Sequence, residues 1–337
     1  MSVEHSQVNA KPYNKHLAPV KVLYIAGFER SGSTIFTKVV GEMDGVFAAG
    51  ELQNIWKRSY IDNIPCGCGR LFQECPVWND VTVATFGSWA EVHPQWILSH
   101  RGGRRMLPLM LLPCGRRFAA SRYAEYLAIL ERLYQSIQET TGARVIVDSS
   151  KGPVYEYMLG LIPGIELYVL NLVRDPRGVQ YSLIRRQQEG DPWYVNHSVK
   201  RSSLAWVGKN LLHEVQTIPR RRRSLRMRYE SFIDDPPVAL ERVLRLIDEP
   251  RLAIPDISQG TVELQQNHIM GGSPHRREFG KTQLRHDDAW LTRMIDKQRA
   301  LVTRLTYPML RWYGYAANPP PTIHHGDVPS ENSVDER

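Results

Sequence analysis

The sequence of 337 residues predicts an α/β fold, a P-loop-like doubly wound, mainly parallel sheet flanked by helices. Apolar strands alternate with amphipathic helices along the chain. The first strand, VKVLYIAG at 20–27, is apolar almost throughout, which is typical of a central parallel strand covered on both faces. It leads through a glycine-containing loop into the helix STIFTKVVGEM, the context of a phosphate-binding loop. We therefore expect a single domain that binds its ligand at the carboxyl ends of the strands.

The later elements keep this alternation. The segment SRYAEYLAILERLYQSIQETTG predicts a long helix with one apolar stripe that ends at Gly142. ARVIVDSSK and ELYVLNLVRDP predict two more strands, and Asp175 is placed to cap a helix that begins at Pro176. The remaining predicted elements are helices in SSLAWVGKNLLHEV, DDPPVALERVLRLI and DDAWLTRMIDKQRALVTRL, and a strand in LRMRY. The segment 256–286 is expected to be loop-rich.

Three ranges describe the predicted domain organisation. Residues 1–18 form a flexible arm, residues 19–316 form the α/β domain, and residues 317–337 have the composition of a disordered tail. Within the domain, residues 82–117 show no clean period. We expect them to form an irregular insertion over the active face.

The composition is that of an ordinary soluble globular protein, with 42% hydrophobic and 23% charged residues. No apolar run approaches the roughly 20 residues that span a bilayer, and the polar N-terminus lacks the apolar core of a signal peptide. We therefore expect a cytoplasmic protein. The net charge of +8 suits an anionic ligand but does not choose among nucleic acid, a membrane surface and a small anion. The basic run 220–223 is interpreted as a solvated loop before a strand, so no nucleic-acid partner is expected.

Four cysteines are too few for a disulfide scaffold in a chain of this size. Cys66, Cys68 and Cys75 cluster in IPCGCGRLFQECPVW, and Cys114 lies apart. The spacing C-x-C-x6-C departs from the standard zinc spacings. It favours loop thiols or one local disulfide over zinc, which would need Cys114 or a histidine as a fourth ligand.

The loop GFERSGST is the first candidate anion site. Gly27 and Gly32 keep the spacing of a P-loop, but Ser33 stands where its lysine would be. Backbone N–H groups from 30 to 34 can point at one phosphate, and the following helix adds its positive N-terminal end. Arg30 supplies a planar, permanently charged fork instead of the lysine. The candidate binding residues of this loop are Arg30, Ser31, Gly32, Ser33 and Thr34.

The segment LVRDPRGVQYSLIRR is a second candidate anion site. Arg174 stands at the end of a strand, and Ser182 and Arg186 follow on the next helix. Because these two are spaced i and i+4, they lie on one helix face. An arginine fork beside a hydroxyl suits a single phosphate.

These motifs together resemble the sulfotransferases that use 3′-phosphoadenosine-5′-phosphosulfate (PAPS). The resemblance runs from about Val20 to Tyr315 and includes VDSSKGP, LVRDPRGVQYS, MRYESF and the W-x-x-x-N of Trp206 and Asn210. The CGCG…CPVW segment looks like the bacterial branch, which is related to carbohydrate and tyrosyl-protein sulfotransferases.

The resemblance implies roles for the candidate residues. The first loop would hold the 5′-phosphosulfate, and Arg174 with Ser182 would hold the 3′-phosphate. Lys151 in VDSSKGP would stabilise the leaving group, together with Arg30. Further nucleotide contacts are implied for Tyr229 and for three residues of a late glycine-containing loop, Gly271, Ser273 and Arg276.

Sulfuryl transfer to an oxygen needs a general base, because the acceptor must lose a proton. A Gly-Glu context similar to that of tyrosyl-protein sulfotransferases implies Glu51 as this base. The alternatives are that Glu51 only orients Arg30 or a backbone amide, or that His93 or His268 is the base. We expect no metal, because the reaction lacks the triphosphate charge that Mg²⁺ neutralises.

The expected function is therefore PAPS-dependent transfer of a sulfuryl group to a small-molecule or carbohydrate hydroxyl, for example in secondary metabolism. A P-loop nucleotide kinase or NTPase and a tyrosyl-peptide sulfotransferase are the alternatives. A nucleic-acid-binding module and an inactive nucleotide-binding relative rank below them. The sequence leaves open the acceptor, O- versus N-sulfation and the oligomeric state.

Overall fold

The computed structural model describes residues 18–112 and 114–319. The predicted arm, except its last residue, and the predicted tail from 320 on lie outside the described residues. The chain divides into two compact units: a larger one of residues up to 174 with 205–285, and a smaller one of 175–204 with residues from 286 on. Each unit is described by itself.

A five-stranded parallel sheet forms the centre of the larger unit. Its strands are β1 (Val20–Gly27), β2 (Val46–Gly50), β3 (Val145–Asp148), β4 (Ile165–Val173) and β5 (Ser224–Arg228), in the order β2-β3-β1-β4-β5. This confirms the predicted fold class. Because β1 lies between β3 and β4, the chain that leaves it emerges where the strand order reverses, which is where ligands bind in such sheets.

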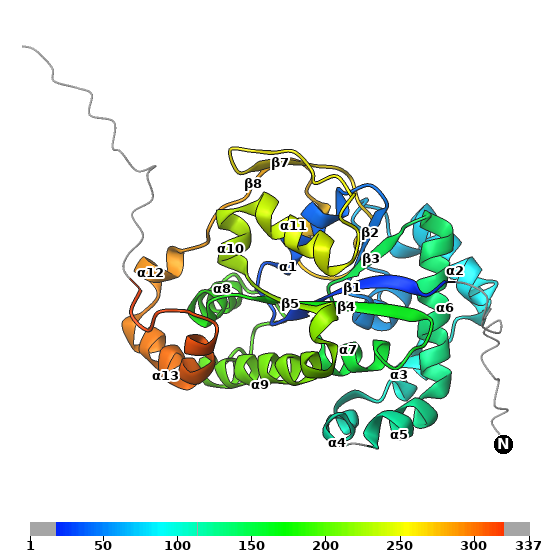
Figure 1. The fold of residues 1–337 in the computed structure, drawn as a ribbon, viewed down its shortest axis with the longest axis horizontal. Helices are drawn as coiled ribbons and strands as arrows, with labels where there is room; N and C mark the ends of the chain where they lie inside the picture. The colour runs from blue at the N-terminus through cyan, green and yellow to red at the C-terminus, as the bar shows by residue number, and fades with distance from the viewer. Residues whose placement is uncertain (1–17, 113, 320–337) are drawn as a thin grey trace, which may run out of the picture. The chain divides into compact units, whose positions relative to one another are not determined.

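Both faces of the sheet are covered, as the apolar β1 sequence predicts. Val22 and Tyr24 belong to one core, and Leu23 and Ile25 belong to the other. The first core includes residues of α6 (Ala124–Thr141) and α7 (Pro153–Leu159); the second includes residues of α1 (Ser33–Gly41), α10 (Tyr229–Asp234) and α11 (Pro236–Leu246). Figure 1 shows the two helix layers on opposite sides of the sheet.

The predicted ends of two helices are found. α6 ends at Gly142, whose φ of 66° is the left-handed conformation that glycine adopts readily. α8 (Pro176–Gln188) begins after Asp175, whose side chain accepts a hydrogen bond from Arg177 N at 2.8 Å.

Three segments differ from the sequence expectation. The 256–286 segment contains a small antiparallel sheet of β6 (Ile257–Ser258), β7 (Thr261–Leu264) and β8 (Gly280–Gln283), whose strands are too short to give a clear alternation. Residues 82–117 contain short helices where irregular structure was expected. These are the end of α2 (Pro76–Phe86), α3 (Pro94–His100), α4 (Leu107–Leu111) and the start of α5 (Gly115–Arg122).

The last helix, expected to be continuous, is divided into α12 (Ala289–Arg293) and α13 (Asp296–Trp312). Met294 between them has extended backbone and is buried with Trp290 and Val302. The break lets three apolar side chains share one core, and burial outweighs helix continuity.

The smaller unit also contains α8 and the first residues of α9 (Val199–Thr217). Arg177 is a buried side chain of this unit with several polar contacts. The guanidinium pairs with Asp175 at 2.6 Å, donates to the carbonyls of Ala316 and Ala317, and lies 4.7 Å from the ring centre of Trp290. This buried cation therefore ties α8 to the end of the described chain.

Within the described residues, the helices are all too short or too polar to cross a bilayer.

Candidate active site

The loop after β1, residues 28–32, makes a tight turn into α1 and is called the phosphate loop below, after its predicted role. Arg30 and Gly32 both have positive φ, at 65° and 81°. A Cβ atom at Gly32 would lie 2.2 Å from two ring carbons of Tyr229, so only glycine lets the loop pack on this ring. Ser31 is 1% exposed, and its Oγ has no hydrogen-bond partner among the described residues. A buried hydroxyl of this kind can accept or donate one further hydrogen bond.

Glu51 stands directly after β2, beside the segment 270–272. Its backbone N–H donates to Met270 O at 2.7 Å, and Met270 N–H donates to Ala49 O at 2.9 Å. A Cβ atom added to Gly272 would lie 3.5 Å from Glu51 Oε1 and 3.6 Å from Thr34 Oγ1. The carboxylate is therefore a neighbour of the phosphate loop.

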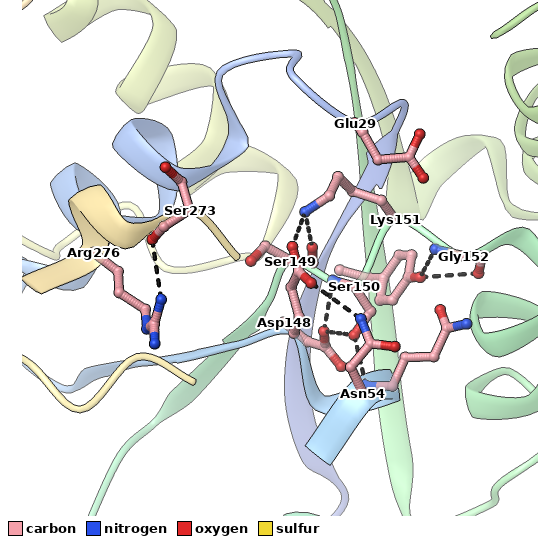
Figure 2. Close-up of polar contacts among 12 residues, drawn as sticks. Glu29, Asn54, Asp148, Ser149, Ser150, Lys151, Gly152, Ser273 and Arg276 are labelled. Atoms are coloured by element: carbon pink, nitrogen blue, oxygen red, sulfur yellow. Dashed lines mark hydrogen bonds and ion pairs between the residues drawn. The ribbon is translucent and has the colours of Figure 1, made fainter. Parts of the chain in front are cut away.

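Lys151 meets Glu51 from the end of β3. Its Nζ lies 2.8 Å from Glu51 Oε1 and donates to Ser149 O at 2.7 Å (Figure 2). The lysine is 7% exposed and has a φ of 62°. A left-handed backbone at a non-glycine residue costs roughly 1–3 kcal/mol and often marks a functional site.

The ion pair fixes the charge state of Glu51. Burial by itself would raise the pKa of Glu51, but the Lys151 ammonium and hydrogen bonds from Lys151 and Asn54 together bring it below its ordinary value. Asn54 Nδ2 donates to the second carboxylate oxygen at 3.1 Å. Glu51 is therefore ionised and able to accept a proton.

Asp148 positions the turn that carries Lys151. It is fully buried, and its Oδ1 accepts hydrogen bonds from Ser150 N at 2.9 Å and from the Ser150 hydroxyl (Figure 2). Oδ2 accepts from the Tyr134 hydroxyl. Burial raises the pKa of Asp148 to about 6, against the lowering effect of these hydrogen bonds. Ser150 Oγ in turn accepts from Gln53 N at 2.9 Å, which connects this turn to the residues after Glu51.

Arg174 approaches the phosphate loop from the end of β4. Its Nη1 donates to Arg30 O at 3.0 Å, and its guanidinium lies 5.3 Å from the ring centre of Tyr229. Tyr229 in turn donates from its hydroxyl to Arg285 O at 3.3 Å. Arg174, Tyr229 and Gly32 therefore form one packed group at the loop.

The late glycine-containing loop lies against Glu51 at its first residue. A Cβ atom at Gly271, where φ is 71°, would lie 2.9 Å from Glu51 Cβ. Ser273 Oγ accepts from His275 N, and Arg276 donates to Ser273 O at 3.2 Å and Pro65 O at 2.8 Å. Arg276 is buried, which lowers its pKa to about 10. In this arrangement Arg276 braces the loop; its predicted nucleotide contact stays a prediction.

The remaining candidates are two residues of α8 and two histidines. Ser182 and Arg186 are on α8 in the smaller unit, so the predicted pair of Arg174 and Ser182 is divided between units and stays a prediction. His93 precedes α3, and His268 lies among cysteine side chains. Within the described part of the chain, neither histidine forms a hydrogen bond with Glu51 or Lys151.

Sequence reasoning missed several positioning residues. Tyr24 of β1 accepts a hydrogen bond from Gly152 N at 2.7 Å and donates to Gly152 O at 2.9 Å, which fixes the residue after Lys151 (Figure 2). Gln53 and Asn54 were also missed. The signal available for Tyr24 was a hydroxyl among the apolar residues 22–26. Gln53 gave none, because its partner Ser150 is distant in sequence, and an asparagine three residues after Glu51 is not by itself a motif.

No family model and no curated protein matches this chain. Among solved structures, it is similar to a sulfotransferase domain from the curacin biosynthetic pathway, with 14% identity, 87% of this chain and 98% of that chain covered, and a TM-score of 0.48. It is also similar to a sulfotransferase domain from the Synechococcus PCC 7002 olefin synthase, with 16% identity, 88% and 96% covered, and a TM-score of 0.47. Both TM-scores are below 0.5, so the function proposed below rests on the geometry of the site.

Proposed function

We propose that this protein transfers a sulfuryl group from PAPS to an acceptor hydroxyl. One observation carries the proposal: the phosphate loop has Ser33 at the position of the P-loop lysine, while Lys151 comes from the end of the neighbouring strand and is paired with Glu51. A nucleotide triphosphatase keeps its lysine on the loop. Here the cation instead stands beside a carboxylate that can act as a base.

The residues of the loop fit a phosphosulfate. Ser31 Oγ needs a hydrogen-bond partner, and the N–H groups at the start of α1 favour an anion. Arg30 to Thr34 would hold the phosphosulfate, with Lys151 beside it. Arg174 and Tyr229 would contact the nucleotide, and the 3′-phosphate contacts of Ser182 and Arg186 stay as the sequence predicts them. When bound, the donor supplies an activated sulfuryl group, and adenosine-3′,5′-bisphosphate is the leaving group.

Glu51 and Lys151 divide the chemistry between them. Glu51 accepts the proton of the acceptor hydroxyl as the new O–S bond forms. Lys151 stabilises the negative charge that develops on the departing oxygen as the old S–O bond breaks. In the described state the two side chains neutralise each other. In catalysis the ammonium turns toward the anionic donor, which frees Glu51 Oε1 for the proton.

A P-loop kinase is the rival that the site must be tested against. It would bind ATP with Mg²⁺, and its lysine would lie on the loop. Lys151 could supply the missing charge, but the rival gives no role to the Glu51–Lys151 pair. We therefore rank sulfuryl transfer first, with a small-molecule or carbohydrate hydroxyl as the acceptor and a cytoplasmic location. A tyrosyl-peptide acceptor is the alternative within the same chemistry.

Calorimetric titration of adenosine-3′,5′-bisphosphate tests the donor site. We expect the wild-type protein to bind it without Mg²⁺ and Arg174→Ala to bind it about 10–100-fold more weakly, since a charge-assisted hydrogen bond contributes roughly 1.5–3 kcal/mol. Arg245→Ala, an exposed arginine paired with Glu241 on α11, is the matched control and should bind normally. Preference for ATP with Mg²⁺, or equal binding by both variants, would contradict the proposal.

A further inference from the structure

Three cysteines and one histidine converge in the larger unit, outside the catalytic residues. The ligand atoms of Cys66, Cys68, Cys75 and His268 all lie within 4.8 Å of one another. His268 Nδ1 lies 3.2 Å from Cys75 Sγ and 3.8 Å from Cys66 Sγ, and Cys68 Sγ lies 3.8 Å from Cys75 Sγ. The histidine is about 190 residues away from these cysteines in sequence, so only the fold brings the four together.

The spacing matches a tetrahedral metal site. Zn²⁺ binds thiolate sulfur at about 2.3 Å and imidazole nitrogen at about 2.0–2.1 Å, which places two sulfurs of a tetrahedron about 3.8 Å apart and a sulfur and a nitrogen about 3.5 Å apart. The two sulfur–nitrogen distances, 3.2 and 3.8 Å, lie on either side of the expected value, and the Cys68–Cys75 sulfur–sulfur distance of 3.8 Å equals it. A disulfide would use two of the three thiols and would leave no role for the histidine nitrogen that faces them.

Backbone hydrogen bonds and the start of α2 fix the positions of the four candidate ligands. Cys66 and Cys68 stand on a tight turn in which Gly69 N–H donates to Cys66 O at 3.0 Å and Cys66 N–H donates to Arg70 O at 2.8 Å. Cys75 directly precedes α2, where the helix N-terminus favours a thiolate. Trp78 Nε1 donates to His268 O at 2.9 Å, which fixes the backbone of the fourth ligand.

We propose that Cys66, Cys68, Cys75 and His268 bind one structural Zn²⁺. Four protein ligands fill the tetrahedron, which is the pattern of a structural site rather than a catalytic one. Binding releases the thiol protons, and the three thiolates and a neutral imidazole hold the ion. This differs from the sequence expectation, which placed the cysteines as loop thiols or a disulfide because C-x-C-x6-C lacks a standard spacing and the histidine was not connected to it.

The metal would brace the catalytic carboxylate. His268 is two residues before Met270, whose backbone pairs with Ala49 and with Glu51 on both sides of Gly50. Gly67 also packs closely on this segment, because a Cβ there would lie 2.0 Å from Asn267 Oδ1. The zinc ion therefore joins the cysteine turn to the segment that supports Glu51, and its loss loosens both.

Metal analysis of the full-length chain, purified without chelator, tests the site. We expect about one zinc per chain in the wild-type protein and a loss of most of it in Cys68→Ser and in His268→Asn. Cys114→Ser is the matched control, because Cys114 is exposed and outside the cluster, and it should keep both zinc and activity. Zinc content unchanged by both ligand variants would overturn the proposal.

Cobalt keeps the test decisive if the ligand variants fail to fold. Wild-type protein stripped of metal and reloaded with Co²⁺ should show the absorption of tetrahedral cobalt with thiolate-to-metal charge transfer. A metal-free protein that takes up neither Zn²⁺ nor Co²⁺, or a Cys68–Cys75 disulfide found by mass spectrometry of unreduced protein, would rule out the site. Neither result depends on bisphosphate binding, so failure of this proposal is distinguishable from failure of the proposed function.

Discussion

The short segment from His268 to Gly271 contacts two regions that are held in different ways. On one side, Met270 pairs through its backbone with Ala49 and Glu51, in the manner of an added strand. On the other side, His268 contacts cysteine side chains. Backbone pairing uses groups that every residue has and needs no particular sequence. The cysteine cluster depends on four specific side chains and, by our proposal, on a metal.

The cysteine cluster and the Glu51 site therefore differ in how much of each can be recognised in the sequence. The cysteines are conspicuous in sequence, but their fourth partner is visible only in the fold. Glu51 is indicated by its Gly-Glu context, but the contacts that place it come from backbone groups, from glycines and from the side chains of Lys151 and Asn54.

We expect the largest loss of transfer activity from substitution of the two proposed catalytic residues, which lie outside the cysteine cluster. Glu51→Gln removes the proposed base while keeping its shape, and should lower the rate of sulfuryl transfer by about 10²–10³-fold. Lys151→Ala should lower it by a similar factor, because one preorganised cation is lost. Both are measured as kcat with saturating donor and acceptor.

Zinc content is the control for these two variants. If the regions are chemically independent, Glu51→Gln retains about one zinc per chain while losing transfer. If Glu51→Gln lost zinc together with transfer activity, the two regions would not be independent. The Glu51 carboxylate would then be needed to hold the cysteine cluster together.

A smaller effect tests the glycine contact that positions Glu51. Gly271→Ala adds a Cβ 2.9 Å from Glu51 Cβ at a φ of 71°, and should lower the transfer rate by about 10–100-fold through displacement of the carboxylate. Gly142→Ala is matched in backbone strain, with a φ of 66° and no atom within 4 Å of its Cβ. Both substitutions should destabilise the fold by about 1 kcal/mol, measured by urea unfolding.

Only Gly271→Ala should affect catalysis. Equal transfer rates in the two alanine variants would mean that the close approach of Gly271 to Glu51 has no catalytic consequence.

The smallest expected effect is the contribution of Asp148, which supports the turn that carries Lys151, to the free energy of unfolding. The pKa of Asp148 is raised to about 6 by burial, so the folded state binds a proton that the unfolded chain does not bind between about pH 4 and pH 6. The stabilisation by this proton is complete below the unfolded pKa and is lost as the pH rises through the folded pKa. Asp148 should therefore add about 1 kcal/mol to the free energy of unfolding when the pH falls from 7 to 5.

Comparison with Asp148→Asn isolates this contribution, because other groups titrate in the same range. The difference in unfolding free energy between wild type and variant should change with pH in favour of the wild type on acidification. A difference that stays constant from pH 7 to pH 5 would show that Asp148 has an ordinary pKa.

Local sequence patterns were enough to predict β1, β3, β4 and β5, two helix ends and the glycine-containing loop after β1. These depend on local patterns: an apolar run for β1, Asp175 before a proline, and two glycines at a fixed spacing. The sequence also placed Arg174 and Lys151 at the ends of predicted strands, whose carboxyl ends face the ligand in such sheets. Glu51 was indicated only by its Gly-Glu context and the family resemblance. The short strands of 256–286 and the break at Met294 were not predicted, since tertiary packing outweighs weak local preferences there.

Which of these residues contact one another follows from the tertiary fold and from no local pattern. The fold paired Lys151 with Glu51, placed the Tyr229 ring on Gly32, and brought His268 to three cysteines. The physical reason is that these contacts join residues far apart along the chain, and their formation depends on strand order and backbone pairing that no local pattern encodes. The sequence supplied the chemical groups, and the order of the parallel strands determined which of them became neighbours.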